Sequence, residues 1–197
     1  GAMAAITPEG VGEYQRRDLG HVDAAMRPTK EDYDRYIWLV QRGRRLSWDE
    51  AKLAEARPFM VADPTMTFVL MRANADLLAM ARAIGQSTDE IEAWSETLTK
   101  GAATLWNPDI GAYASRDVLS GKRTGTVSNA SFLCWYAGLE APEAMPAFDR
   151  IAAAAPFGVP SYAPAAPHFD ARRYWRGPSW PMLTKARRSW KTRKGAM

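Results

Sequence analysis

The amino-acid sequence predicts an all-α protein built from helical hairpins. Apolar residues recur every three or four positions through most of the 197-residue chain, which is the spacing of one face of an α-helix. Helix start and stop signals come in pairs and divide the chain into helix–loop–helix units of roughly 50 residues, with no convincing series of strands. Such hairpins could stack as a solenoid, a bundle or part of a closed toroid, and periodicity alone does not choose among these.

Composition excludes several classes of protein. Hydrophobic residues make up 47% and charged residues 24% of the chain, a balance typical of a folded globular protein rather than a disordered one. No run approaches the roughly 20 apolar residues of a membrane span, and the first residues lack a signal-peptide pattern. One cysteine, Cys134, and two histidines are too few for a disulfide framework or a histidine- or cysteine-based metal site. We therefore expect a cytoplasmic protein with neither metal nor cofactor, and we assign Cys134 to the core.

The positive charge is concentrated at one end of the chain. The formal net charge is +4, but residues 185–197 carry six Lys or Arg residues and no acid. Without these six, 20 basic residues face 22 acidic ones, so the remainder is mildly acidic. We interpret residues 185–197 as a solvated basic tail and residues 1–184 as the domain, and we predict no specific nucleic-acid partner.

The first predicted helix has a capping signal. Thr29, followed three residues later by Asp32, resembles a capping box with a shorter acid and predicts a helix over residues 30–46. Residues at helical spacing would form its inward face, whose last member is an arginine that extends its head group to solvent. This face comprises Tyr33, Tyr36, Ile37, Val40 and Arg44.

The second predicted helix is the clearest in the chain. Asp63 can accept hydrogen bonds from the free amides of the first turn, and Pro64 fits the first helical position. Gly85 would end the helix in the left-handed conformation that glycine allows. Apolar residues at helical spacing between these signals predict a face packed in the core. They are Met66, Val69, Leu70, Ala73, Leu77, Met80, Ala81 and Ile84.

Four further segments follow along the chain. A third helix begins at Ser87 and is broken by Asn-Pro-Asp at residues 107–109. Residues 110–126 predict a long loop or a small hairpin. Residues 128–138 are apolar enough for a fully buried helix, and residues 145–155 predict a shorter one.

The last part of the domain predicts a loop and then a helix. Residues 156–173 contain four prolines and no helical period, which is typical of a long loop that lines a site. A final helix would begin at Pro178 and continue into the tail, because proline fits the first turn of a helix.

Residues 172–181 hold the densest group of chemistry-bearing side chains, in the order Arg-Arg-Tyr-Trp-Arg-Gly-Pro-Ser-Trp-Pro. Aromatic faces can stack on the apolar faces of sugar rings, and arginine forks bind carboxylates or hydroxyls. Gly177 allows a close backbone approach. The segment therefore suits an anionic or polyhydroxylated ligand, although Trp175 and Trp180 could instead be core aromatics and Arg176 a surface charge.

The same segment resembles a known family. Residues 174–181 are similar to a motif of the glycoside hydrolase family 63-like enzymes, especially the mannosylglycerate and glucosylglycerate hydrolases. Weaker matches precede it in the same order, so that the resemblance covers residues 9 to about 182. They include Arg16-Arg17-Asp18, Arg27-Pro28-Thr29, Tyr33-Asp34-Arg35-Tyr36, Asp63-Pro64 and Phe157-Gly158-Val159-Pro160-Ser161.

The resemblance implies a fold and an activity. The fold would be part of an (α/α)6 toroid, six helical hairpins around an axial pocket, and the reaction would be hydrolysis of an α-glycosidic bond with inversion by two carboxylates. The substrate would be a small glycosyl-glycerate, glucosylglycerate or mannosylglycerate, or a related α-glucoside. Arg17 would pair with the glycerate carboxylate, and the sugar subsite would comprise Tyr174, Trp175, Arg176, Gly177 and Trp180.

The sequence departs from the family pattern at both catalytic positions. The acid of the family, an aspartate, would precede residue 1, and its base, a glutamate, would follow the last motif, where this sequence becomes basic after Met182. Spacing identifies no acid/base pair among the acids within the chain. Asp63 fits a helix cap, and Asp18 could either help line the pocket or pair with a neighbouring arginine. We therefore expect a truncated middle fragment that contains no catalytic residue and is inactive alone.

Three functional hypotheses remain open from the sequence. The chain is a fragment of a glycoside hydrolase, a noncatalytic helical scaffold or sugar-binding module, or a binder of phosphates or acidic membrane through its tail. We also expect a homo-oligomer, because a few hairpins could not cover every apolar face. The faces that could not all be covered within one chain carry Tyr36, Ile37, Val40, Phe132 and Trp135.

Overall fold

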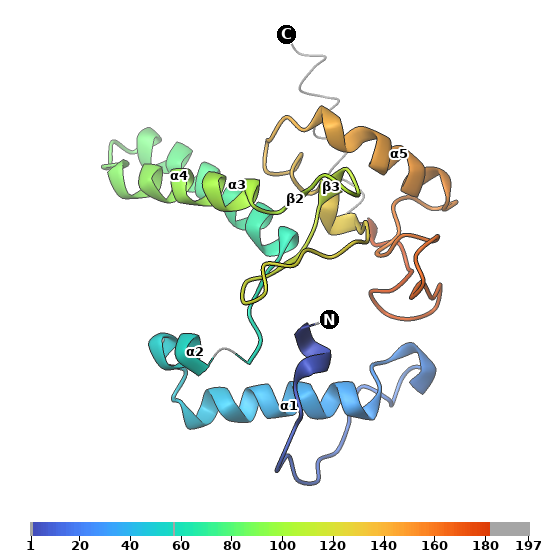
Figure 1. The fold of residues 1–197 in the computed structure, drawn as a ribbon. Coiled ribbons are helices and arrows are strands. Elements are labelled where there is room, and N and C mark those ends of the chain that lie inside the picture. The colour runs from blue at the N-terminus through green and yellow to red at the C-terminus, as the bar shows by residue number, and fades with distance from the viewer. Residues whose placement is uncertain (1, 57, 182–197) are drawn as a thin grey trace.

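The computed structural model describes residues 2–56 and 58–181, and the predicted tail therefore lies outside the described residues. Helices dominate the fold, which also contains two small two-stranded sheets (Figure 1). The α-helices are α1 (Lys30–Arg45), α2 (Glu50–Ala56), α3 (Pro64–Ala83), α4 (Asp89–Ala103) and α5 (Met145–Ala153). The strands are β1 (Val61–Ala62), β2 (Trp106–Asn107), β3 (Ala112–Tyr113) and β4 (Arg116–Asp117), and short 3-10 helices cover Ala2–Ala5, Ala24–Met26, Asn129–Phe132 and Pro142–Ala144.

The capping box at the start of α1 is confirmed. The backbone N–H of Asp32 donates to Thr29 Oγ1 at 3.1 Å, and the Thr29 N–H donates back to Asp32 Oδ2 at 3.1 Å. The predicted inward face of this helix, however, is only partly covered, because Tyr33 and Ile37 are half-buried and its other members are exposed. Tyr36 and Val40 keep 39% and 40% of their surface exposed, and Arg44 is exposed as well. The reason is that no other long helix of the described residues lies alongside α1 (Figure 1).

Both ends of α3 form as predicted. Asp63 Oδ1 accepts from the N–H of Thr65 at 2.9 Å and of Met66 at 3.3 Å, and Gly85 follows the helix with φ 69°. The next helix, α4, begins at Asp89 rather than at the predicted Ser87.

A buried amide joins α3 to α4 in an antiparallel hairpin. Asn74 Nδ2 donates to the Ile91 carbonyl at 3.1 Å and to Ser95 Oγ at 2.6 Å, although Asn74 is only 7% exposed. The face of α3 that carries Phe68, Asn74 and Ala81 is therefore the buried one.

The prediction that the apolar stripe of α3 packs in the core is wrong. Met66, Leu70 and Met80 are exposed at 70%, 55% and 65%, and Val69, Leu77 and Ile84 are also exposed. Only Ala81 of the predicted stripe is buried. The reason is geometric: α4 covers the opposite side of α3, and the hairpin projects away from the rest of the described chain (Figure 1).

Two short antiparallel ladders organise residues 106–117. Strands β2 and β3 pair as the small hairpin expected in this region, with Trp106 opposite Tyr113. Strand β1, just before α3, pairs with β4, with Val61 opposite Asp117. This second pairing joins segments more than 50 residues apart, and the sequence did not predict it.

The core lies around residues 129–151, and the α-helix predicted over residues 128–138 is wrong. The chain there forms the 3-10 helix Asn129–Phe132 followed by turns. The rings of Phe132, Trp135 and Phe148 pack with centroid distances of 5.1–5.6 Å, and each side chain is at most 4% exposed. Of the faces that were not all expected to be covered, those of Phe132 and Trp135 are covered within the chain. Tertiary packing of rings shapes this short segment more strongly than helical periodicity.

Cys134 lies in this core, as predicted. It is fully buried, and burial raises the pKa of its thiol to about 12. Helix α5 forms within the predicted range and ends at Ala153.

The predicted final helix does not begin at Pro178. Pro178 accepts a hydrogen bond from the Ser161 N–H at 3.0 Å, and Ser179 bridges to Pro160, so no helix begins at Pro178. The rest of that predicted helix lies outside the described residues. No helix among the described residues is long and apolar enough to cross a membrane.

Candidate functional site

Residues 170–176 form a turn that is closed by its own hydrogen bonds. Asp170 Oδ1 accepts from the N–H of Arg172 at 3.0 Å and of Arg173 at 3.3 Å. The Asp170 N–H donates to the Arg176 carbonyl at 3.0 Å, which joins the two ends of the turn. Because these bonds are local, the turn keeps its shape without a surrounding helix or strand.

Three aromatic rings gather on this turn. Tyr174 lies edge-on to Trp175 and to Trp180, with centroids 5.5 and 5.0 Å apart, and the two tryptophan rings are 5.1 Å apart. Tyr174 and Trp175 keep 44% and 49% of their surface exposed, so neither is a core residue. Trp175 also has φ 61°, a left-handed conformation that bulky residues rarely adopt and that is often retained at ligand-binding sites.

Gly177 makes a close approach to the chain itself. Its N–H donates to Ser161 Oγ at 3.0 Å, and a Cβ at this position would overlap the backbone of Asp170 and Ala171. The close approach that the sequence predicted at this glycine is therefore internal packing of the turn. Gly177 therefore shapes the turn that carries the exposed rings.

The turn lies against the start of α1, and together they enclose a pocket with a volume of ≈ 440 Å³. Four segments of the chain line the pocket. They are the first 3-10 helix, the start of α1 together with Pro28 before its cap, the loop that contains Tyr162, and the turn of residues 170–176. Tyr174, Trp175 and Arg176 of the predicted sugar subsite meet here, whereas Gly177 and Trp180 support them from outside the lining. The lining residues are Met3, Ala4, Pro28, Asp32, Tyr36, Tyr162, Arg173, Tyr174, Trp175 and Arg176.

The charges of the pocket are two arginines and one carboxylate. Arg173 pairs with Asp32 at 3.5 Å, an ion pair between residues 141 positions apart. Burial opposes ionisation of Asp32, but hydrogen bonds from Thr29 and the charges of Arg173 and Arg176 outweigh it and hold the pKa of this carboxyl below its usual value. Asp32 is therefore an ionised structural group, and the pocket keeps an excess of positive charge.

A second contact fixes the turn to the segment before α1. The Tyr174 N–H donates to the Met26 carbonyl at 3.2 Å, and the Arg27 guanidinium lies 5.4 Å from the centroid of the Tyr174 ring. This cation–π contact orients the ring that borders the pocket.

Arg17, predicted to bind a glycerate carboxylate, does not line this pocket. It is exposed in the turn before α1, where its neighbour Arg16 makes the contacts. Arg16 pairs with Asp18 at 2.7 Å and lies 4.1 Å from the Tyr33 ring centroid. Asp18 is thus an ion-pair partner, which was one of the two explanations that the sequence allowed.

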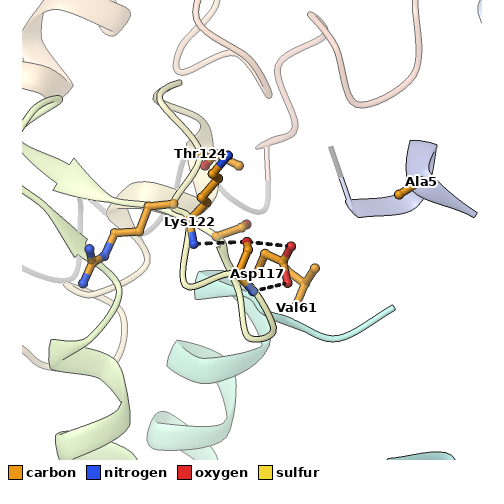
Figure 2. A pocket seen from close by; sticks show the side chains of 8 residues that line it. Ala5, Val61, Asp117, Lys122 and Thr124 are labelled. Carbon is orange, nitrogen blue, oxygen red and sulfur yellow. Dashed lines mark hydrogen bonds between the residues drawn. The ribbon is translucent and has the colours of Figure 1, made fainter. Parts of the chain in front are cut away.

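A larger hollow of ≈ 560 Å³ lies beside the loop after β4. Figure 2 shows Asp117, Lys122 and Thr124 on one side of it and Ala5 on the other. Hydrogen bonds from the Ser120 hydroxyl and the Leu119 amide lower the pKa of Asp117, so its carboxylate is ionised. Both of its oxygens accept hydrogen bonds from residues of its own turn. This hollow therefore offers no free acid.

Sequence reasoning missed several lining residues. Asp32 was recognised only as a cap, and Tyr36 only as part of a helix face. Tyr162 belongs to the loop that was expected to line a site, and Arg173 lies next to the recognised motif. A signal for Asp32 was present, because Arg27-Pro28-Thr29 was one of the matched motifs and lies just before it.

The comparisons with known proteins agree on a class of enzyme, the glycoside hydrolases. A family model described as the mannosylglycerate hydrolase MGH1-like glycoside hydrolase domain matches residues 1–186. The chain therefore belongs to this family of glycoside hydrolase family 63-like proteins, as the resemblance in the sequence indicated.

Individual relatives extend this result. Mannosylglycerate hydrolase MGH1 of Selaginella moellendorffii is 41% identical over an alignment of 185 residues that covers 91% of this chain and 38% of the relative. The mannosylglycerate hydrolase of Thermus thermophilus is 37% identical over 90% of this chain and 44% of its own length. This chain is also similar to a crystal structure of a GH63 mannosylglycerate hydrolase from Thermus thermophilus in complex with Tris and D-glycerate. The two superpose with a TM-score of 0.91 and 33% sequence identity, and the match covers 99% of this chain and 48% of the other. The chain thus spans less than half the length of these relatives.

Proposed function

We propose that this chain is part of an inverting α-glycoside hydrolase that acts on mannosylglycerate, glucosylglycerate or a related α-glucoside. The observation that carries this proposal is the pocket in which the exposed rings of Tyr174 and Trp175 lie beside Arg173 and Arg176. Ring faces suit the apolar face of a sugar, and guanidinium groups suit the carboxylate of glycerate. A relative crystallised with D-glycerate supports this ligand class. In the same proposal, the hairpins form part of an (α/α)6 toroid.

Binding is assigned to this chain, and catalysis to groups outside it. Inversion needs two carboxylates about 6.5–9.5 Å apart, with room for water between them. Among the described residues that line the pocket, Asp32 is the one carboxylate, and its low pKa suits an ion pair rather than a general acid. We therefore assign the family's acid and base to the part of the relatives that this chain does not match.

The same observation favours a second candidate function, a sugar- or glycerate-binding module without turnover. Both candidates require ligand binding in this pocket, and they differ only in whether the acid and base are supplied. Arg176 is the candidate for the glycerate carboxylate. Arg17 keeps this role only as a sequence prediction, because it does not line the pocket.

Ligand binding by variants tests the proposal. We expect calorimetry to detect binding of mannosylglycerate or glucosylglycerate to the chain, and an assay for released hexose to detect no turnover. Trp175→Ala and Arg176→Ala should each weaken binding at least about tenfold while folding stability changes little. Arg82→Ala and Trp48→Ala, at exposed positions away from the pocket, are the matched controls. Two results would contradict the proposal: unfolding of both pocket variants with unchanged ligand affinity, or turnover that disappears when an aspartate of this chain is replaced.

A further inference from the structure

The carboxylate of Asp32 is held in a fixed position at the wall of the pocket. Its Oδ2 accepts hydrogen bonds from the Thr29 N–H at 3.1 Å and from the Thr29 hydroxyl at 2.9 Å, and its Oδ1 lies 3.6 Å from the Arg35 guanidinium. These contacts belong to the capping box and the first turn of α1, so they do not depend on a ligand. The negative charge of Asp32 therefore stays beside the pocket whether or not an anion is bound there.

Asp32 also lies close to both arginines of the pocket. Arg173 Nη2 is 3.5 Å from Asp32 Oδ2, a longer contact than those that Thr29 makes. Burial raises the pKa of Asp32, but hydrogen bonds from Thr29 and the charges of Arg173 and Arg176 lower it by more. Both guanidinium groups are thus within electrostatic reach of this carboxylate. An anion that binds to either arginine consequently lies near Asp32 as well.

The charges that line the pocket sum to one positive charge. Among the described lining residues, Arg173 and Arg176 are cationic, Asp32 is anionic and the others are neutral. Arg27 and Arg35 lie nearby, but neither lines the pocket. A carboxylate such as glycerate brings one negative charge and balances this sum. A phosphate ester of the same acid adds about 1.5–2 further negative charges near pH 7, which the lining does not balance.

We propose that Asp32 is a specificity-determining residue, which makes the pocket select a singly charged carboxylate and reject its phosphate ester. This inference rests on the proposed function and adds to it the charge of the group that the sugar carries. Arg173 and Arg176 attract both anions, whereas the fixed carboxylate of Asp32 repels each anion in proportion to its charge. The repulsion is therefore about threefold greater for the phosphate ester. Asp32 thus acts against the wrong ligand, which is a common source of specificity.

Calorimetry with D-glycerate and 3-phospho-D-glycerate, at pH 7 and one ionic strength, tests this role. The wild-type chain should bind D-glycerate more tightly. In Asp32→Asn, the affinity for 3-phospho-D-glycerate should rise at least about tenfold and that for D-glycerate only about threefold, because the neutral amide no longer repels either anion. The amide oxygen can still accept from the Thr29 N–H, so the helix cap is retained. Damage to the fold would lower both affinities and could not raise one of them.

Two neighbouring variants are the controls. Glu31→Gln removes the same charge one residue earlier on α1, but the Glu31 side chain is 71% exposed and does not line the pocket. Solvent screens this charge, so the ratio of the two affinities should stay within about twofold of the wild-type ratio. Thr29→Ala breaks the capping box and leaves the charge of Asp32 in place. It should lower thermal stability without changing the ratio.

The outcomes separate this inference from the proposed function. A wild-type chain that binds neither of the two anions, nor mannosylglycerate or glucosylglycerate, would overturn both. If the chain binds D-glycerate, the inference alone is overturned by any of three results. These are a wild-type preference for 3-phospho-D-glycerate, an affinity ratio that Asp32→Asn leaves unchanged, and an equal change of the ratio in Glu31→Gln.

Discussion

The α3–α4 hairpin and the aromatic core around residues 129–151 use apolar residues in opposite ways. α3 is the longest helix among the described residues, yet most of its large apolar side chains are exposed. The core segment forms only short 3-10 helices and turns before α5, yet Phe132, Trp135 and Phe148 are almost completely buried. The periodicity of apolar residues therefore indicates that a helix forms. Whether those residues are buried depends on which other elements pack against the helix.

The core should show the largest effect of a single substitution. Trp135→Ala removes a ring that contacts both Phe132 and Phe148, so we expect the free energy of unfolding to fall by about 3–5 kcal/mol. Leu77→Ala on the exposed face of α3 should change it by about 0.5 kcal/mol or less. Chemical denaturation of both variants, at concentrations low enough to keep the chain monomeric, measures the difference. Equal losses would mean that the two regions are covered alike.

The contact between α3 and α4 should show the next effect. Asn74→Ala removes the amide that donates to the Ile91 carbonyl and to Ser95, and it leaves their buried polar atoms with fewer partners. We expect a loss of about 1–3 kcal/mol in the free energy of unfolding. Arg72→Ala, which breaks the exposed pair with Asp76 two residues away, should cost about 0.5 kcal/mol or less. A larger loss for Arg72→Ala would show that surface charge holds the hairpin.

Local signals explain which elements could be predicted from the sequence. The caps at Thr29 and Asp63 involve partners within three residues, so the sequence contains every group that forms them. The pairing of β1 with β4 and the turns of residues 128–138 depend on contacts that are distant in sequence, so local patterns could not indicate them.

The same distinction applies to the candidate site. Tyr174, Trp175 and Arg176 were predicted because they are consecutive and chemically distinctive. The pairing of Asp32 with Arg173 could not be predicted, since it spans 141 positions. The sequence predicted a close backbone approach at Gly177, and the structure shows that the backbone of Asp170 and Ala171 makes one.

Two glycines of the α3–α4 hairpin should give the smallest effects, with opposite signs. Gly101 lies within α4, and a Cβ there would meet nothing within 4 Å, so Gly101→Ala should raise the free energy of unfolding by about 0.5–1 kcal/mol through better helix propensity. Gly85 has similar open space but a φ of 69°, so Gly85→Ala should lower it by about 1 kcal/mol through backbone strain. Thermal unfolding of the two variants side by side measures both shifts. Because open space is common to both positions, the opposite signs isolate backbone conformation as the cause. Shifts of equal sign would instead mean that backbone conformation does not decide the effect of a methyl group at these positions.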